Sequence, residues 1–255
     1  MARVLITGST GLLGRWTLAH WPAELEAVEA LHDEHDLTDA RAFVALVRAT
    51  QADVVLHLAW CASGTPNYRT SNDNERWTES SLQAARYCMK EGVRFIATGT
   101  VVDTTPGSDR YATAKHELRT HLQREIAEES IAWIRPFYVF DPVARRPALV
   151  ADCLEARSAG RTVELRSPHS KHDFIHASDV GEAMVQIISH GLAGVIDVGS
   201  GVARTVRDLA SACGAVVADH VGDGRPAAEV VADTSELAAR GWRPRATTTF
   251  FAGAQ

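Results

Sequence analysis

The chain has 255 residues, of which 45% are hydrophobic and 23% are charged, and its formal net charge is −6. These values are ordinary for a water-soluble globular protein and suit one large α/β domain or one domain with a small appendage. Acidic and basic residues are interspersed, which argues against a nucleic-acid-binding surface and against a polybasic membrane patch. We therefore expect neither nucleic acid nor a membrane among its partners.

The sequence also gives no sign of export or of a metal site. It enters its first predicted strand at once, and no apolar run approaches the length of a membrane span. The four cysteines, Cys61, Cys88, Cys153 and Cys213, are scattered without the spacing of metal ligands. We expect free thiols in a reducing cytoplasm, no signal peptide and no metal.

The first predicted element is a buried strand at residues 3–7, which runs directly into a glycine-rich turn and an amphipathic helix. Glycines let the backbone bend sharply and approach a pyrophosphate, which then sits at the positive end of the helix. The turn therefore predicts a dinucleotide-binding site. Its predicted cofactor contacts are Gly8, Thr10, Gly11, Leu12, Leu13 and Gly14.

Acidic residues follow the second predicted strand, at residues 28–31. Asp33 comes about 19 residues after Gly14, close to the spacing at which such folds place a ribose-binding carboxylate. A carboxylate there binds the adenosine ribose and repels a 2′-phosphate, which favours NAD over NADP. Asp36, with Leu37 beside it, competes for the same role.

Strands and helices alternate over the first half of the chain. A helix is predicted over residues 40–50, and Asp39 before it suits either an N-cap or a ligand. Nearly continuous apolar strands, typical of a parallel sheet buried on both faces, alternate with further helices: strands at 53–58, 94–98 and 131–135, helices at 72–91 and 109–129. The alternation predicts an α/β fold, a Rossmann-type doubly wound parallel sheet with ligands beyond the carboxyl ends of its strands.

The pattern loosens after Pro136. Helices are predicted there at 148–159 and 178–190, and a strand is predicted at 195–198. A further helix is predicted directly after Thr205, which would be its N-cap. We expect residues 1–140 to form the dinucleotide-binding core. Residues 141–255 would form mainly a small substrate-binding C-terminal lobe, with some segments returning to the core.

Three residues predict catalysis. Tyr111 and Lys115 are four residues apart, so they lie on one face of a predicted helix. A nearby ammonium favours the phenolate, so Lys115 is expected to lower the pKa of Tyr111 from about 10 toward neutral pH. Tyr111 would then exchange a proton with a carbonyl or an alcohol as a hydride moves. Thr98, at the carboxyl end of a predicted strand, would polarise the same substrate oxygen.

The histidines are assigned more modest roles. His57 lies inside a predicted buried strand and is expected to be a hydrogen-bonded structural residue. His169, His172 and His176 lack the spacing and the companion ligands of a metal site. We expect them on a loop and a strand that line the substrate cleft.

Ordered motifs over nearly the whole chain carry a resemblance to a known family. They are Thr7-Gly8-x-x-Gly11-x-x-Gly14, Asp36-Leu37-Thr38-Asp39, His57-Leu58-Ala59, Thr98, Tyr111-x-x-x-Lys115, Arg135-Pro136-Phe137, His172-Asp173-Phe174-Ile175, Val198-Gly199-Ser200-Gly201 and Gly241-Trp242-x-Pro244. With them the chain resembles the extended short-chain dehydrogenase/reductase family, in particular its NAD-dependent epimerase/dehydratase branch, which acts on nucleotide sugars.

The resemblance implies a cofactor pose and further contacts. NAD(P) would lie across the strand ends, with Lys115 on the nicotinamide ribose and Tyr111 as the acid/base. The additional cofactor contacts that it implies are Leu58, Ala59, Pro136 and Tyr138. The substrate contacts are Thr100, Phe137, Arg166 and His172. Homodimers through the helices at 72–91 and 109–129 are common in the family, so a second copy of the chain is a possible partner.

Departures from the family pattern bear on the reaction. Gly99 and Thr100 stand where sugar 4,6-dehydratases of the family carry an acidic pair, so dehydration is not expected. No cysteine lies near Thr98, which argues against the epimerase-reductase chemistry that makes GDP-fucose. The loop from Thr98 to Tyr111 is about half the usual length, which implies a more open site or an altered substrate.

His172 is a further departure, because an arginine usually stands there and helps to bind the substrate diphosphate. Either Arg166 or Lys171 compensates, or the substrate is not a nucleotide diphosphate. The segment 36–39 looks most like that of dTDP-4-dehydrorhamnose reductases.

We therefore expect NAD(P)-dependent reduction of a keto group on a nucleotide-linked deoxysugar, with Tyr111 as the proton donor and Thr98 holding the oxygen. One alternative is a nucleotide-sugar epimerase with tightly bound NAD. The other is a non-catalytic dinucleotide-binding regulator, which the presence of both Tyr111 and Lys115 disfavours.

Overall fold

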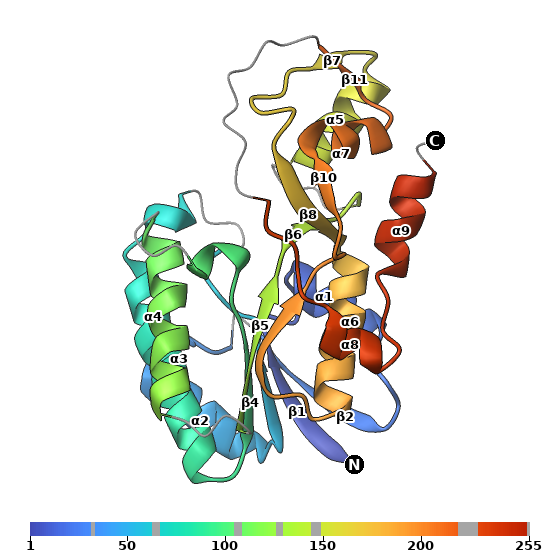
Figure 1. Ribbon diagram of the computed structural model, residues 1–255. Helices are drawn as coiled ribbons and strands as arrows, with labels where there is room; N and C mark the ends of the chain where they lie inside the picture. Colours follow the sequence, from blue (N-terminus) through green and yellow to red (C-terminus); the bar gives the residue numbers. More distant parts are fainter. Residues whose placement is uncertain are drawn as a thin grey trace. The chain divides into compact units, whose positions relative to one another are not determined.

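The computed structural model describes residues 1–31, 34–62, 67–104, 109–125, 130–143, 149–218 and 229–253. Figure 1 shows their helices and strands. The chain divides into two compact units. The first comprises Met1–Pro136 and Met184–Ile196, and the second comprises Phe137–Ala183 and Asp197–Gln255.

A six-stranded sheet with the order β2-β1-β3-β4-β5-β9 forms the centre of the first unit. Its strands are β1 (Ala2–Thr7), β2 (Leu25–Ala30), β3 (Val54–His57), β4 (Arg94–Thr98), β5 (Ile131–Pro136) and β9 (Gly194–Val198). The pairs from β2 through β5 are parallel. From β1 the order runs to β2 on one side and to β3 on the other. The carboxyl ends of β1 and β3 therefore form a topological switch point, where such sheets bind ligands.

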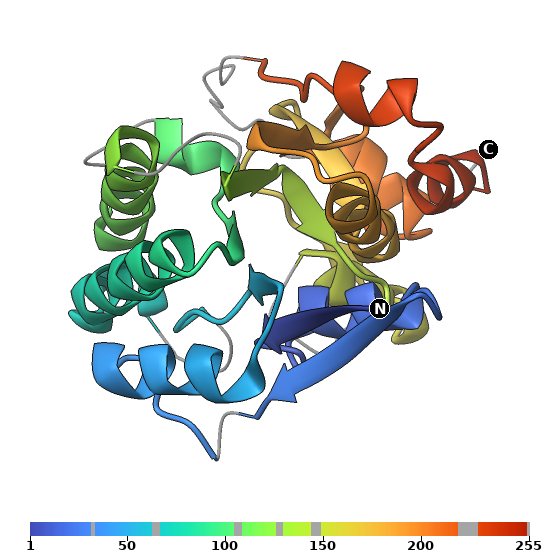
Figure 2. The same ribbon diagram turned by 90° about the horizontal axis from the view of Figure 1, so that it is seen from below.

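Helices cover both faces of this sheet. Figure 2 shows α2 (Ala40–Thr50), α3 (Asp73–Lys90) and α4 (Arg110–Glu125) along one face and α1 (Leu12–Ala19) along the other. Two short 3-10 helices, η1 (Tyr68–Thr70) and η2 (Val101–Thr104), come before α3 and α4. Apolar side chains of the strands and of the three helices form one core on that face, which includes Leu5, Val55, Phe95, Trp133, Phe43, Trp77, Leu118 and Leu122. The doubly wound α/β fold predicted from the sequence is confirmed.

The second unit has short strands and four helices of its own in its described part. The strands are β6 (Tyr138–Phe140), β7 (Thr162–Val163), β8 (Lys171–His176), β10 (Ala203–Thr205) and β11 (Val216–Val217), in sheets of order β10-β8-β6 and β11-β7. The helices are α5 (Leu149–Ser158), α7 (Val206–Ala212), α8 (Ser235–Ala239) and α9 (Arg245–Ala252), while α6 (Ala177–Ser189) is divided between the two units. Whether this unit binds the substrate stays a prediction.

A buried carboxylate organises the second unit. Asp173 on β8 is fully buried and accepts hydrogen bonds from Ser200 N (2.6 Å), Ser200 Oγ (2.6 Å), Gly201 N (2.9 Å) and Ala232 N (3.0 Å). Gly199 lies against it, because a Cβ there would be 2.6 Å from Asp173 Oδ2. A buried charge is tolerated when donors surround it in this way. The Asp173-Phe174 motif and the Gly199-Ser200-Gly201 motif therefore form one structural feature.

Capping side chains mark the starts of two helices. Asp39 caps α2, because its Oδ1 accepts from Arg41 N (2.7 Å) and Ala42 N (3.1 Å), so the N-cap alternative is confirmed. Thr205 caps α7 in a capping box with Asp208. The predicted helix at 40–50 and the predicted strand at 94–98 coincide with α2 and β4.

The boundaries of other predicted elements differ from those in the structure. The strand predicted at 28–31 is β2, which begins earlier at Leu25, and of its residues Ala30 alone is fully buried. An edge strand of this kind lacks the continuous apolar run of its neighbours, which explains the shift. The last four residues of the helix predicted at 109–129 lie outside the described residues.

None of the described helices is long and apolar enough to cross a membrane. In the same part of the chain, no three His, Cys, Asp or Glu side chains gather as metal ligands would.

Candidate active site

The glycine-rich turn after β1 packs directly on the turn after β3. Gly8 has a positive φ of +71°, and a Cβ on it would lie 2.7 Å from Ala59 N. A Cβ on Gly14 would lie 2.3 Å from the carbonyl oxygen of Gly8. Both positions therefore require glycine, for backbone conformation at Gly8 and for close approach at both. These contacts place the predicted cofactor residues Leu58 and Ala59 beside the turn.

The start of α1 suits the pyrophosphate of a dinucleotide. Its N-cap is Gly11, which provides no side-chain hydrogen bond, and its first turn carries no acidic residue. The first amide N–H groups and the positive end of the helix dipole are thus open to an anion. Ser9 Oγ in the same turn is buried and has no hydrogen-bond partner among the described residues. The turn therefore fits the phosphate groups of NAD or NADP, while contact with them by Gly8, Thr10, Gly11, Leu12, Leu13 and Gly14 stays a prediction.

A hydrogen-bond chain fixes the ends of β1 and β3. Thr7 Oγ1 lies 2.7 Å from His57 Nδ1, and Ser81 Oγ lies 2.9 Å from His57 Nε2. Ser81 donates its own proton to the carbonyl oxygen of Trp77 (2.6 Å), so it accepts from Nε2 of the imidazole. Nδ1 then accepts the Thr7 hydroxyl proton, and Ala59 N donates to Thr7 Oγ1 (3.2 Å).

His57 is neutral at this position. It is 1% exposed, and burial, assisted by the charge of Lys115, lowers its pKa to about 3. The structural role predicted for His57 is confirmed, and its hydrogen bonds link the carboxyl end of β1 to α3.

The acids proposed for ribose binding are only partly described. Asp33 lies outside the described residues, so its role stays a prediction. Asp36 Oδ1 accepts from Thr38 N (3.0 Å) and Thr38 Oγ1 (2.6 Å), and its Oδ2 lies 3.7 Å from Arg76 Nη2. Leu37 is 6% exposed and belongs to the core, so only its backbone is open to a cofactor.

The three predicted catalytic residues gather at the carboxyl end of β4. Thr98 is the last residue of β4, and the ammonium of Lys115 on α4 donates to its carbonyl oxygen at 2.8 Å. Tyr111 lies one helical turn before Lys115, and its phenol is hydrogen-bonded to the side chain of Thr100. Thr98 Oγ1 is 3.5 Å from the carbonyl oxygen of His57, so its hydroxyl is only weakly engaged.

The electrostatics of the pair differ from the expectation. Burial raises the pKa of Tyr111 above its usual value of about 10, with a further contribution from Tyr68, while Arg69 opposes the rise. Burial also lowers the pKa of Lys115 to about 7. The prediction that Lys115 lowers the pKa of Tyr111 toward neutral pH was therefore wrong for this structure, because desolvation dominates and the charge that opposes it is that of Arg69. Burial thus favours the protonated phenol over the phenolate at neutral pH.

Aromatic side chains around Tyr111 were not predicted from the sequence. The Tyr68 ring meets the Tyr111 ring edge-on, at 5.2 Å between centroids, and the Trp60 ring meets it at 6.5 Å. Arg69 lies over the Tyr111 ring at 5.9 Å and pairs with Asp109 just before α4. These residues come from the segment between β3 and α3, and no spacing pattern links that segment to α4.

Gly99, directly after the predicted catalytic residue Thr98, has no room for a side chain. A Cβ there would lie 2.3 Å from Trp133 Nε1 and 2.6 Å from Asp103 Oδ2. Trp133 and Asp103 are themselves joined by a hydrogen bond of 2.8 Å. A carboxylate cannot be accommodated at this position unless both buried groups move, which agrees with the absence of dehydratase residues.

The predicted substrate contacts Phe137, Arg166 and His172, with the predicted cofactor contact Tyr138, belong to the second unit. The rings of Tyr138 and His172 are 4.1 Å apart, and burial lowers the pKa of His172. Phe137 is 6% exposed, so its side chain serves mainly the core. The binding roles of these residues stay predictions, as does that of Pro136, which ends β5 in the first unit.

Arg166 and Lys171 are the two cations predicted to take the role of the arginine that His172 replaces. Lys171 forms an ion pair with Glu229, with Nζ and Oε2 3.1 Å apart. Arg166 is exposed and has no ion-pair partner among the described residues. Arg166 is therefore the freer of the two for an anionic ligand.

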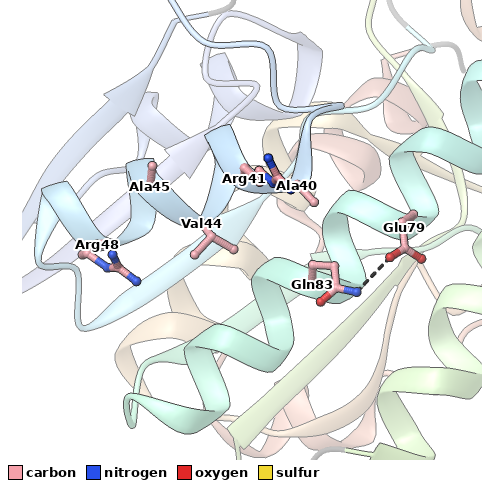
Figure 3. A pocket seen from close by; sticks show the side chains of 7 residues that line it. All are labelled: Ala40, Arg41, Val44, Ala45, Arg48, Glu79 and Gln83. Carbon is pink, nitrogen blue, oxygen red and sulfur yellow. Dashed lines mark hydrogen bonds between the residues drawn. The ribbon is translucent and has the colours of Figure 1, made fainter.

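A surface groove lies apart from this chemistry. It has a volume of about 490 Å³ and lies between α2 and α3, where Glu79 and Gln83 are hydrogen-bonded to each other (Figure 3). Its lining residues are Ala40, Arg41, Val44, Ala45, Arg48, Glu79 and Gln83, and none of them is a predicted site residue.

Comparison with known proteins identifies the family. The NAD dependent epimerase/dehydratase family matches residues 4–199. The chain belongs to this family. It is an enzyme of the family, an oxidoreductase or an epimerase, and the motifs quoted from its sequence lie largely within the matched range. No curated protein sequence matches the chain.

Solved structures share the fold at low sequence identity. UDP-glucose 4-epimerase of Thermus thermophilus, in complex with NAD, is 22% identical, with a TM-score of 0.71 and coverage of 99% of this chain and 100% of that one. dTDP-4-dehydrorhamnose reductase of Bacillus anthracis str. Ames, in complex with NADP, is 13% identical (TM-score 0.74, coverage 95% and 94%). WbmG of Bordetella bronchiseptica, in complex with NAD and UDP, is 20% identical (TM-score 0.69, coverage 95% and 89%).

The buried neutral His57 makes stability depend on pH. The unfolded chain binds a proton at His57 near pH 6.5, whereas the folded chain resists it until about pH 3. The stabilising contribution is therefore complete above pH 6.5 and is lost as the pH falls. Between pH 6 and pH 4, we expect the wild type to lose about 1.4 kcal/mol per pH unit more than His57→Gln loses, measured by urea unfolding.

Exposed His190 provides the matched control, because His190→Gln removes a histidine that is solvated in both states. The free energy of unfolding of His190→Gln should change with pH in the same way as that of the wild type. Parallel pH dependences for the wild type and His57→Gln would show that His57 is not held neutral.

Proposed function

We propose that the protein reduces a keto group on a nucleotide-linked deoxysugar with NADH or NADPH as the hydride donor. The observation that carries the proposal is the gathering of Thr98, Tyr111 and Lys115 at the end of β4, with Lys115 Nζ 2.8 Å from the Thr98 carbonyl oxygen. This end of the sheet also holds the glycine-rich turn and the topological switch point. The proposed proton donor, Tyr111, and the glycine-rich turn proposed to bind the dinucleotide thus lie at the same edge of the sheet.

The residues divide the chemistry between them. When bound, the nicotinamide supplies a hydride to the carbonyl carbon. Tyr111 donates its phenolic proton to the carbonyl oxygen, while the weakly engaged hydroxyl of Thr98 holds that oxygen. Lys115 donates to the Thr98 carbonyl oxygen and would also donate to the nicotinamide ribose. Its ammonium also stabilises the phenolate that remains on Tyr111, which regains a proton from water.

The protonation state of Tyr111 favours reduction over the epimerase alternative. An epimerase begins by removing a proton from an alcohol, which needs the phenolate form. Burial raises the pKa of Tyr111, so the phenol enters the reaction protonated. A group in its acid form suits a reaction that begins with a ketone. The crowding at Gly99 supports the absence of dehydratase chemistry.

Proposals for the substrate and the cofactor draw on the family and the similar folds. A nucleotide sugar is the proposed substrate class, in line with the nucleotide-sugar names of the similar structures and the UDP bound to WbmG. Asp33 and Asp36 support NAD as the preferred cofactor, because carboxylates repel a 2′-phosphate. Arg76 lies 3.7 Å from Asp36 and would attract that phosphate, so both cofactors have to be compared.

Substitution of the proton donor tests the proposal. We expect Tyr111→Phe to lower the turnover of dTDP- and UDP-linked 4-keto sugars by about 100-fold or more, because the phenyl ring cannot donate a proton. Binding of NADH or NADPH, followed by fluorescence titration, should stay close to that of the wild type. Tyr87→Phe, which changes a tyrosine of α3 that packs against Arg48 of α2, should keep wild-type turnover. Undiminished turnover by Tyr111→Phe would refute the assignment of Tyr111.

The cofactor content of the purified protein separates the reductase from the alternatives. The measurement is mass spectrometry of the small molecules released when freshly purified protein is heated. We expect a largely empty protein that then binds added NADH or NADPH, because a reductase exchanges its cofactor at each turnover. About one NAD⁺ per chain would favour the epimerase instead. Failure to bind either cofactor would contradict the enzymatic proposal.

A further inference from the structure

One aromatic side chain contacts both members of the Tyr111–Lys115 pair. The ammonium of Lys115 lies over the ring of Trp60, 3.5 Å from its centroid. The Trp60 ring also meets the Tyr111 ring edge-on, at 6.5 Å and 77°. The family resemblance assigned a role to Ala59 and none to the residue after it. Trp60 is therefore not one of the predicted catalytic residues, which are Thr98, Tyr111 and Lys115.

The ammonium of Lys115 needs such a partner because it is almost fully buried. Lys115 is 3% exposed, and its one hydrogen bond in the described structure is donated to the Thr98 carbonyl oxygen. A buried ammonium is costly without compensating groups around it. The face of an indole ring carries negative potential and attracts a cation, most strongly where water is excluded. Trp60 thus supplies a second favourable contact to Lys115.

The indole of Trp60 is itself held in a fixed orientation. Its Nε1–H donates to Asn74 Oδ1 at 2.8 Å, and its ring stacks on Trp77 at 5.9 Å. Asn74 is fully buried, and its Nδ2 donates to the carbonyl oxygens of Tyr68 (2.7 Å) and Ser71 (2.9 Å). With both donors of the amide engaged, Oδ1 is the atom left to accept from Trp60. The ring face offered to Lys115 is therefore set by α3.

We propose that Trp60 is a positioning residue for the Tyr111–Lys115 pair, and that its indole face keeps the Lys115 ammonium charged and in place beside the Thr98 carbonyl. The inference rests on the proposed function, in which this pair serves proton and hydride transfer. Trp60 would act through Lys115 and would not exchange a proton itself.

The ionisable groups around Lys115 determine the direction in which its pKa should change when Trp60 is replaced. Burial lowers the pKa of Lys115 to about 7, and the Asp103 carboxylate in η2 opposes that shift. Burial raises the pKa of the Cys61 thiol after β3, so Cys61 carries no charge at pH 7. His57 on β3 is neutral, and Tyr111 on the same helix is protonated, so neither adds a charge at pH 7. The indole face favours the ammonium form as well. Replacing it with an aliphatic side chain should therefore let Lys115 lose its proton at lower pH.

The first test uses the wild-type protein and requires no turnover. The chain has three lysines, Lys90, Lys115 and Lys171, so selective ¹³C labelling of the lysine ε-carbons gives few NMR signals. Lys90→Arg and Lys171→Arg identify the signals of the two exposed lysines. The ε-protons of Lys115 should resonate upfield of the other two, because they lie over a ring face. Equal shifts for all three lysines would overturn the proposal.

The second test removes the ring face. In Trp60→Leu, the titration midpoint of Lys115 should fall by about one pH unit, and the upfield shift should vanish. Trp60→Phe keeps an aromatic face and should show a smaller change, which preserves the test if the leucine variant does not fold. Trp21→Phe changes a tryptophan that donates to the Leu25 carbonyl oxygen and should leave Lys115 as in the wild type. An unchanged midpoint in folded Trp60→Leu would overturn the proposal.

Kinetics connect the contact to the reaction. The alkaline limb of the pH profile for keto-sugar reduction should move to lower pH in Trp60→Leu, in step with the Lys115 midpoint. If the midpoint moves and the profile does not, Trp60 has no positioning role in the reaction. If the wild type shows the upfield shift but reduces none of the keto sugars, the proposed function fails while the Trp60–Lys115 contact stands.

Discussion

The contact between the turns that follow β1 and β3 is the constraint on which the rest of the site depends. The two backbones approach so closely that a Cβ on Gly8 would be 2.7 Å from Ala59 N. The hydrogen bonds through Thr7 and His57 hold the two strand ends in register. The residue after Ala59 is Trp60, which reaches Lys115. The glycine-rich turn and Lys115, to which we assign cofactor binding and catalysis, are therefore positioned by the same strand end.

Burial decides the chemistry of the pair more than charge does. Tyr111 and Lys115 are both desolvated, and in each case desolvation is the largest cause of the pKa shift. Burial keeps the Tyr111 phenol protonated and lowers the pKa of Lys115 to about 7, and in the proposed reaction that phenol is the proton donor. Groups that hold the ammonium form of Lys115 then bear directly on how much of the enzyme is competent at a given pH.

The sequence predicted the parts of the structure that local pattern controls. The glycines after β1, the helix that Asp39 caps and the apolar run of β4 all follow from short-range signals, and the structure contains them. Strands of two or three residues, such as β7 and β11, carry too little pattern to be predicted. Asp173 was recognisable as part of a motif, but its four hydrogen-bond donors come from residues 200, 201 and 232, which only the tertiary fold brings together.

In the site, too, local pattern predicted some features, and the tertiary fold determined the others. Spacing on one helix predicted that Tyr111 and Lys115 share a face, but it could not reveal how deeply they are buried, so the direction of the Tyr111 pKa shift was wrong. Trp60 and Tyr68 reach Tyr111 from a separate segment of chain, and Asn74 fixes the ring of Trp60 from α3. Such contacts depend on how β3 and α4 lie across the sheet, which no local signal encodes.

Transfer of deuterium is the most direct test of hydride transfer to a nucleotide-linked keto sugar. The protein would be incubated with NADH or NADPH that carries deuterium at C4 of the nicotinamide, together with a panel of dTDP- and UDP-linked 4-keto sugars. We expect one sugar of the panel to gain deuterium at the reduced carbon while oxidised cofactor accumulates in equal amount. Products without deuterium, or epimerised sugar with no net oxidation of the cofactor, would contradict the account.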